Sequence, residues 1–170
     1  MKTIKILTLT LLGAIFLHSC SAPIDKNFVK QNLISAESVM LLGVNIGDSM
    51  PEVEKKLKGK TDWEFKKWKS EGNTAISMKK EWSNSDMSLA FHSQENKVSK
   101  IFLMVNGKGE DAVAVRKVND ELQAEIEGSS NYKNIGRNKW HFKESIRVDF
   151  TLDNFDGSQV MNIELVEFPH

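Results

Sequence analysis

Residues 87–93 read Met-Ser-Leu-Ala-Phe-His-Ser, so that every second side chain up to Phe91 is large and apolar. Successive side chains of a β-strand point to opposite faces of the sheet. This period of two therefore predicts a strand with one buried and one wetter face. The same alternation runs from Ile146 to Leu152. The two stretches predict antiparallel strands that turn one face to a core.

Turn-forming residues divide much of the remaining chain into further strands. Clusters of Gly, Asn, Ser and Gln separate the short apolar runs, as is typical of strand ends. Strands are expected over residues 63–69, 74–82, 87–93 and 98–106, and again around 140–142, 146–152 and 161–165. Asn154-Phe155-Asp156-Gly157 is the expected hairpin turn between the last two strands.

A short helix is predicted to begin after Ser49. Ser49 and Glu52 form an S-x-x-E capping box, which satisfies backbone N–H groups at a helix start, and Pro51 suits the first turn. Gly59 is placed to end the helix in the left-handed conformation. The sequence thus marks the start and the end of this helix.

The clearest helix signal covers Glu110 to Glu127, where apolar residues recur at spacings of three and four before Gly128. Residues 49–106 and 110–168 share one order, in which a helix precedes aromatic-bearing strands and a closing hairpin. This order predicts an internal duplication. The predicted fold class is α+β, with two helix-plus-antiparallel-strand repeats that pack two helices against an antiparallel sheet.

The first 19 residues have the organisation of a bacterial export signal. Two lysines precede an apolar run from Ile6 to Leu17, which is too short to span a bilayer core of about 30 Å as a helix. The tetrad Leu17-His18-Ser19-Cys20 resembles the lipobox of bacterial lipoproteins, in which the cysteine sulfur receives diacylglycerol and becomes the new N-terminus. An ordinary secretory signal followed by an incidental cysteine is the alternative.

Cleavage before Cys20 would divide the chain into a lipoprotein signal peptide (1–19), a lipid-anchored tether (20–38) and an α+β domain (39–170). The tether contains Pro23 and scattered polar residues with little apolar periodicity. By analogy with lipoprotein sorting, Ser21 rather than Asp after the cysteine favours the outer membrane. The expected location is the cell envelope, on either the periplasmic or the surface face.

Charge and cysteine content exclude several classes of protein. After the leader the chain has 21 basic and 23 acidic side chains, which excludes a globally basic nucleic-acid binder. Residues 51–108 carry a net charge of +4 and residues 109–170 a net charge of −5; ordinary solvated surfaces explain this asymmetry. Cys20 is the only cysteine, so the folded domain has no internal disulfide and no cysteine metal ligand.

The stretch Ile46-Gly47-Asp48-Ser49-x-x-x-Val53-x-x-x-Leu57 resembles the opening of small envelope lipoproteins of the BamE (SmpA) kind and of the repeats in β-lactamase-inhibitor-like domains. The resemblance covers about a dozen residues and the order of a helix followed by strands. Those families act by binding, since the first helps outer-membrane β-barrel assembly and the second caps an enzyme. The resemblance implies an interaction module, and it carries over no functional residue.

No catalytic or metal-binding motif stands out in the sequence. His92, His141 and His170 have no second histidine or cysteine at metal-ligand spacing, and surface or sheet-face positions are the better interpretation. Asp153-x-x-Asp156-Gly157 resembles a fragment of a calcium loop but lacks the alternating ligands of an EF-hand. No cofactor and no enzymatic activity are expected, although a Ser or carboxylate pair assembled across the fold stays open.

The candidate ligand surface is the stretch from Trp63 to Lys69, where aromatic side chains interleave with lysines. Its residues Trp63, Phe65, Lys67 and Trp68 could stack on sugar rings or meet anionic headgroups. On a strand, Trp63 and Phe65 share one face and Trp68 takes the other, so at least one aromatic side chain is expected to be exposed. Core packing is the alternative explanation for the others.

Three functions are consistent with these observations. The first is a non-enzymatic cell-envelope lipoprotein that acts as a protein-interaction or accessory module, with the membrane (through its anchor) and another envelope protein as partners. The alternative is a periplasmic binder of a glycan, a lipid or an anionic molecule. The third is an unrecognised hydrolase, which requires a buried polar constellation with perturbed pKa values.

Replacing Cys20→Ser should release the protein from membranes, because lipid attachment requires the cysteine sulfur and lipid supplies the anchoring energy. The measurement is the distribution of the chain between membrane and soluble fractions of lysed cells. Detergent-dependent membrane attachment of the variant would contradict the lipoprotein assignment.

Overall fold

The computed structural model describes residues 39–70, 73–82 and 84–168. The predicted signal peptide, Cys20 and the predicted tether lie outside the described residues. The helices and strands are α2 (Met50–Lys58), β1 (Glu64–Ser70), β2 (Asn73–Trp82), β3 (Ser85–Gln94), β4 (Lys97–Lys108), α3 (Glu110–Glu127), β5 (Tyr132–Gly136), β6 (Lys139–Phe142), β7 (Ile146–Phe155) and β8 (Ser158–Glu167).

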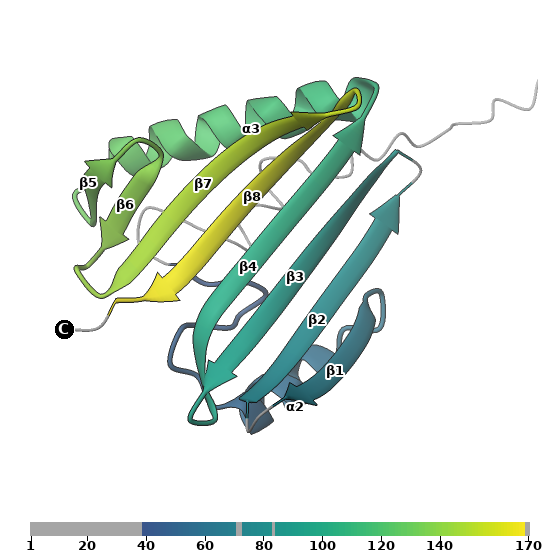
Figure 1. Ribbon diagram of the computed structural model, residues 1–170, viewed down its shortest axis with the longest axis vertical. Coiled ribbons are helices and arrows are strands. Elements are labelled where there is room, and N and C mark those ends of the chain that lie inside the picture. Colours follow the sequence, from purple (N-terminus) through teal and green to yellow (C-terminus); the bar gives the residue numbers. More distant parts are fainter. Residues whose placement is uncertain (1–38, 71–72, 83, 169–170) are drawn as a thin grey trace, which may run out of the picture.

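All eight strands belong to one antiparallel sheet with the order β1-β2-β3-β4-β8-β7-β6-β5 (Figure 1). The only neighbours in this sheet that are not consecutive among the strands of the chain are β4 and β8. They pair over nine residues of each strand, with Met104 opposite Asn162 at the middle of the ladder. This central pair joins the four N-terminal strands to the four C-terminal strands.

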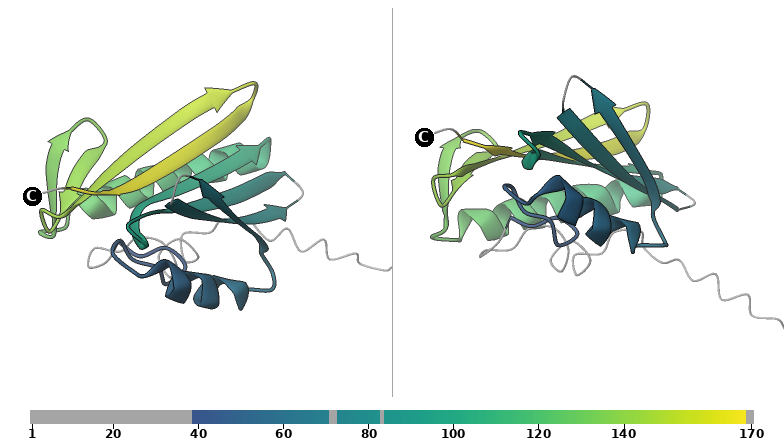
Figure 2. Two further views of the ribbon diagram at one scale, coloured as in Figure 1. Left: turned by 60° about the horizontal axis from the view of Figure 1, so that its bottom comes forward. Right: turned by 90° about the horizontal axis from the view of Figure 1, so that it is seen from below.

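The two helices lie on the same side of the sheet (Figure 2). Helix α3 packs against β4 and β8 and presents to them an apolar row of Val115, Val118, Leu122 and Ile126. Trp140 and Phe150 meet edge to face beneath the C-terminal strands, with their ring centroids 5.5 Å apart. Each large apolar side chain that is fully buried in this layer contributes about 1.5–3 kcal/mol relative to an exposed one. Burial therefore stabilises the described domain, which has no disulfide.

The α+β fold class expected from the sequence, with two repeats packing two helices against the sheet, is wrong. Strands make up 56% and helices 21% of the described residues. Only α3 packs against the central strands β4 and β8, whereas the nine-residue α2 contacts mainly β2. Both predicted helices are present, but the sequence pattern of a helix does not give the area of sheet that the helix covers. The structure is mainly one broad antiparallel sheet.

The order of one helix followed by four strands occurs twice along the described chain. Helix α2 precedes four antiparallel strands, and α3 precedes four more, with each set pairing in chain order from the edge of the sheet toward its centre. This recurrence describes topology rather than ancestry, so the internal duplication of residues 49–106 and 110–168 stays a prediction.

The boundaries of α2 follow the sequence only in part. Pro51 lies in the first turn as expected, but the Ser49 hydroxyl donates to the Glu52 carboxylate at 2.8 Å and no side chain caps a backbone N–H group. Gly59 ends the helix with φ −75°, so the left-handed conformation expected there is wrong. The capping box of the sequence is thus a contact between two side chains.

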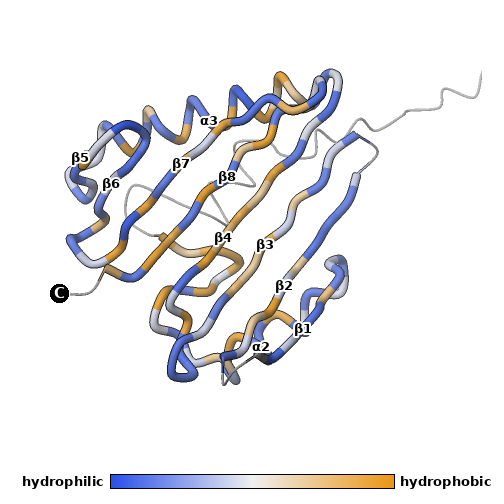
Figure 3. Tube along the Cα trace, in the orientation of Figure 1, coloured by the Kyte–Doolittle hydropathy of each residue, from blue (hydrophilic) through white to orange (hydrophobic). Residues whose placement is uncertain are grey.

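Hydropathy along the strands confirms the alternation read from residues 87–93. Figure 3 shows the apolar residues concentrated along the central strands β3, β4 and β8. Met87, Leu89 and Phe91 are fully or almost fully buried, and the hairpin between β7 and β8 is present with Asp156 and Gly157 at its tip. These two residues have φ 48° and φ 76°, as a two-residue hairpin loop of the I′ type requires.

Gly107 on β4 allows α3 to approach the sheet closely. A Cβ atom at this position would lie 2.6 Å from the Asp111 carbonyl oxygen and 2.8 Å from the Val115 Cγ2 atom. Real Cβ atoms do not approach backbone so closely, so any larger residue must push the first turns of α3 away. The start of this helix is therefore fixed by the absence of a side chain.

Replacing Gly107→Ala should lower the free energy of unfolding by about 1–3 kcal/mol, the usual cost of overpacking. Gly136→Ala is the matched control, because nothing lies within 4 Å of a Cβ atom at Gly136, and it should change the stability by no more than about 0.5 kcal/mol. Urea denaturation of the two variants measures the difference. Equal effects would show that the contact with α3 does not limit the fold.

Candidate functional site

We refer to the side of the sheet that points away from the helices as the open face. Among the described residues, no helix or loop covers it (Figure 2). Its central side chains are half-buried between their neighbours and come from β3, β4 and β8: Ser88, Ala90, Phe102, Met104, Val160, Asn162, Glu164 and Val166. The open face is therefore a described surface that the fold itself leaves without a cover.

The strand register places small side chains beside large ones on this face. Ala90 lies directly opposite Phe102, and Ser88 lies opposite Met104. On the next strand, Ser77 lies opposite Ala90. The apolar side chains of β4 consequently stand beside a floor of small residues on β2 and β3, which exposes their flanks to a partner.

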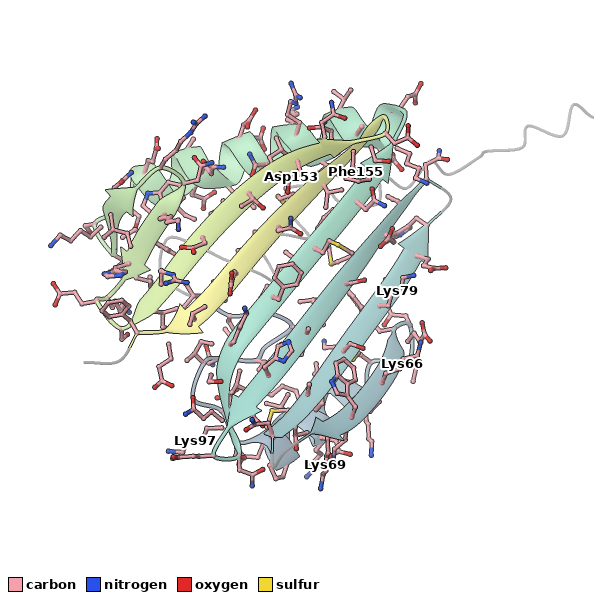
Figure 4. The ribbon with its side chains drawn as sticks, viewed as in Figure 1. Lys66, Lys69, Lys79, Lys97, Asp153 and Phe155 are labelled. Atoms are coloured by element: carbon pink, nitrogen blue, oxygen red, sulfur yellow. The ribbon has the colours of Figure 1, made fainter. Side chains whose placement is uncertain are left out.

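Charged side chains flank this centre and, at Glu164 opposite Phe102, lie within it, and they pair with one another. Lys66 binds Glu64 at 2.7 Å, Lys79 binds Glu81 at 2.5 Å, and Lys100 forms an ion pair with Glu164. Arg147 Nε lies 3.2 Å from Asp149 Oδ2. Figure 4 shows Lys66 and Lys79 on the β1–β2 flank and Asp153 near the far end of β7. The face therefore carries charges of mixed sign around a central region that is mostly apolar or neutral.

The structure separates the four residues of the candidate ligand surface predicted from the sequence. Trp63 is 8% exposed and belongs to the core, and Phe65 packs against that core. Lys67 pairs with Glu54 of α2 on the helix side. Trp68 is 45% exposed and lies on the open face, in register with Ala75 of β2. Of the four, only Trp68 lies on the open face.

Glu54 of α2 binds two lysines on the helix side of the sheet. Hydrogen bonds from the Lys58 and Lys67 side chains lower the pKa of Glu54 to about 2. Glu54 stays ionised at neutral pH and keeps the ammonium group of Lys67 on the helix side. Lys67 is therefore already paired with Glu54, whereas a lysine that binds a ligand would have a free ammonium group.

His92 and His141 lie on the open face but far apart. The register links them through Lys100, Val166 and Arg147, so four strand intervals of about 4.8 Å separate them by about 19 Å. Two ligands of one zinc ion each lie about 2 Å from the metal. The two histidines therefore cannot share a metal ion, and the described residues contain no metal-binding cluster of His, Cys, Asp or Glu.

Groups with shifted pKa values are spread over the described part of the chain. Hydrogen bonds from lysines lower the pKa of Asp62 and of Glu64, and burial raises the pKa of Tyr132. Burial, followed by the charge of Lys100, lowers the pKa of His92. These groups lie on different elements, and the geometry brings no two of them together in a shared cavity.

The residues at the centre of the open face were missed by sequence reasoning. Phe102 and Met104 stand between Ile101, Leu103 and Val105, so β4 is apolar on both of its faces. A strand without alternation is expected where both faces are covered. Here one of those faces has no cover among the described residues. The unbroken apolar run of β4 was therefore the feature of the sequence that could have indicated this surface.

Comparison of the chain with models of protein families, with curated proteins and with solved structures finds no match. The likeness to BamE-type and β-lactamase-inhibitor-like domains thus stays a prediction from the sequence. Among the described residues, neither helix is long and apolar enough to cross a membrane.

Replacing Lys100→Met should raise the pKa of His92, because it removes a nearby positive charge and frees the carboxylate of Glu164. The pKa should stay below the usual value of 6.5, since burial is the larger cause of the shift. Folding disfavours the protonated imidazole, so this histidine lowers stability as the pH falls below 6.5. An NMR titration of the imidazole measures the change. Lys97→Met is the control, and a fall in the pKa in Lys100→Met would contradict the assignment.

Proposed function

We propose that this chain is a non-enzymatic lipoprotein of the bacterial cell envelope, anchored through Cys20, and that its open face docks another envelope protein. The observation that carries the proposal is the uncovered face of an eight-stranded sheet with Phe102 and Met104 at its centre. A strand that is covered on both faces of its sheet carries apolar side chains on both faces, and β4 has this pattern.

The extent of the open face favours a protein over a small molecule. Eight strands have seven intervals of about 4.8 Å, so the sheet is about 34 Å wide. Small-molecule sites are concave and enclose most of the ligand. A broad surface with apolar residues at its centre and charges around them has the anatomy of a protein interface.

The pattern of charge also favours a protein partner. The ion pairs of Lys66, Lys79 and Lys100 neutralise most of the flanking charge within the chain itself. Such a face does not attract a polyanion such as nucleic acid over long distances. Association would instead depend on apolar contact and on hydrogen bonds to neutral acceptors such as the Asn162 amide oxygen, because the amide nitrogen already donates to Thr151 and Asp153.

The predicted lipid anchor suits such a task. An anchored chain is confined to the membrane surface, which raises the rate at which it meets other proteins of that surface. Proteins of oxidising compartments such as the cell envelope are often stabilised by disulfides. This domain has no disulfide and is stabilised by burial instead. The resemblance to binding families in residues 46–57 points in the same direction.

A periplasmic ligand binder is the second candidate, and the exposure of Trp68 favours it. This indole is 45% exposed on an edge strand between Lys67 and Lys69. An exposed aromatic ring can stack on a sugar. Saturable quenching of tryptophan fluorescence by a defined oligosaccharide, lost in Trp68→Ala, would favour this second function.

A photo-crosslinking amino acid at Met104 should give one discrete crosslinked product in intact cells of the native bacterium, since the open face would be covered by a partner. The same amino acid at Val113, which is 71% exposed on α3, is the matched control and should give none. Gel electrophoresis after irradiation measures the products.

The design includes a second variant on the open face. Asn162 lies opposite Met104 on β8, so the same product should form from position 162. Crosslinks from Val113 but not from the open face would contradict the proposal, and so would an open face that yields no product at either position.

A further inference from the structure

The open face carries opposite charges at its two ends. The register aligns its side chains in four cross-strand lines, which we number from the end of the sheet near Lys97 to the end near Asp153 (Figure 4). Within the described strands, line one has three cations and no carboxylate: Lys100, Arg147 and Lys133. Line four has three carboxylates and no cation: Glu81, Asp86 and Asp153. The formal charges of the two ends are therefore equal and opposite.

The two lines between these ends are neutral. Line two crosses the central strands through Ala90, Phe102, Glu164 and Asp149, and line three crosses them through Ser88, Met104, Asn162 and Thr151. Farther out, Lys66 and Lys139 balance the two carboxylates of line two. Lys79 balances Glu64 in line three. Along the strands the formal charge thus runs +3, 0, 0 and −3.

This charge pattern is complementary to itself. A two-fold axis that runs across the strands, above Leu103 and Ile163, lays a second copy face to face on the first. The rotation keeps each strand over its own counterpart and reverses the lines, so line one lies over line four and line two over line three. Arg147 then lies over the second copy's Asp153, and both ends of the face meet the opposite charge.

The apolar centre also matches itself under this rotation. Phe102 of line two lies over the second copy's Met104 of line three, and the reciprocal contact lies on the other side of the axis. A thioether makes favourable contacts with an aromatic ring. Ala90 lies over the second copy's Ser88, and these small side chains leave room beside the two large ones. The centre of the face therefore offers a second copy both apolar contact and space.

A two-fold axis parallel to the strands gives no such match. It would lay β3 over β7 and β4 over β8, so that Asp86 faces the second copy's Asp153 and Phe102 faces Glu164. Like charges in contact oppose association, and an aromatic ring presents a negative face to a carboxylate. With the axis across the strands, Glu164 keeps Lys100 of its own chain as its ion-pair partner. The register thus selects the axis across the strands.

The area of the face is sufficient for a stable dimer. Strands β2, β3, β4, β8 and β7 contribute to all four lines, over about 24 Å by about 27 Å, and the partial lines of β1 and β6 bring the total to about 800 Å². A standard stable interface buries about 800 Å² on each partner. Lys97 and Lys108 are exposed beyond the outer lines and would stay in solvent at the rim, where charged residues are usual.

We propose that the occupant of the open face is a second copy of this chain, related by a two-fold axis across the strands. The inference rests on the proposed docking function of this face, and it names the partner. Packed sheets lie about 10 Å apart with interdigitating side chains. The dimer is therefore a sandwich of two sheets with the helices of each copy on its outer sides.

The first test is analytical ultracentrifugation of the chain from Cys20 onward, with Cys20→Ser to keep it soluble. Interfaces of this size have dissociation constants from micromolar to picomolar, so the chain at about 100 µM should sediment as a dimer. A monomer at this concentration would overturn the proposal.

A charge swap tests the orientation of the two copies. Asp153→Lys places a lysine over the second copy's Arg147 and should weaken dimerisation at least about tenfold. Adding Arg147→Glu restores opposite charges between the copies and should recover most of the affinity. The two positions lie about 20 Å apart along β7, so this rescue cannot arise within one chain. Glu127→Lys, on the exposed last turn of α3, is the matched control and should leave the affinity unchanged.

A second swap covers the case in which Arg147→Glu does not fold. Asp86→Lys should weaken the dimer, because this position lies over the second copy's His92 beside Lys100, and His92→Glu should restore it. An absence of rescue, or a loss of affinity in Glu127→Lys equal to that in Asp153→Lys, would overturn the proposed orientation.

Photo-crosslinking from Met104 in intact cells separates a failure of this inference from a failure of the docking function. A product of twice the mass of the chain that contains only this chain supports the second copy. A product with a different protein supports docking at the open face and overturns the second copy. The absence of any product contradicts both.

Discussion

The pairing of β4 with β8 is the constraint on which the rest of the structure depends. Every other strand pairs with a neighbour that follows or precedes it among the strands, and such hairpins form locally. The β4–β8 ladder alone joins segments about 60 residues apart, from Lys100 opposite Val166 to Lys108 opposite Ser158. Without it, each set of four strands would have a single helix to cover it and a core too small for independent stability.

That central ladder also fixes where the helix and the two faces lie. Helix α3 packs over β4 and β8, and Gly107 lets it begin directly above the end of β4. With α3 on one side, the other side of the same two strands becomes the centre of the open face. Phe102 and Met104 are thus placed opposite the main helix by the same ladder that joins the halves of the sheet.

Much of the local structure could be predicted from the sequence, because period and turn chemistry are local properties. The alternation at Met87–Phe91 and the Asp156-Gly157 turn are both present in the structure. Strand β5 was missed because only Tyr132 among its five residues is buried, so no period of two exists. The fold class was wrong because the layering depends on which strands meet at the centre, and no residue pattern records the β4–β8 pairing.

The candidate site was harder to predict than the fold. The Trp63–Lys69 stretch looked like one surface, yet the pleat sends Phe65 and Lys67 to the helix side and leaves Trp68 on the other. The exposure of the apolar run in β4 depends on neighbours from distant strands. Composition could not distinguish an apolar residue beneath a helix from one on an open sheet.

The outer edge of the sheet at β1 has a consequence for how copies of the chain behave at high local concentration. An unpaired strand edge is a template for joining sheets into fibres, and lysines placed along it oppose this because pairing with another sheet would bury their charge. Strand β1 carries Lys66, Lys67 and Lys69, while the opposite edge strand, β5, is short and bears a register shift between Asn134 and Gly136. Copies of the chain at high local concentration can therefore collide edge to edge without joining their sheets, and the open face is left as the surface available for contact.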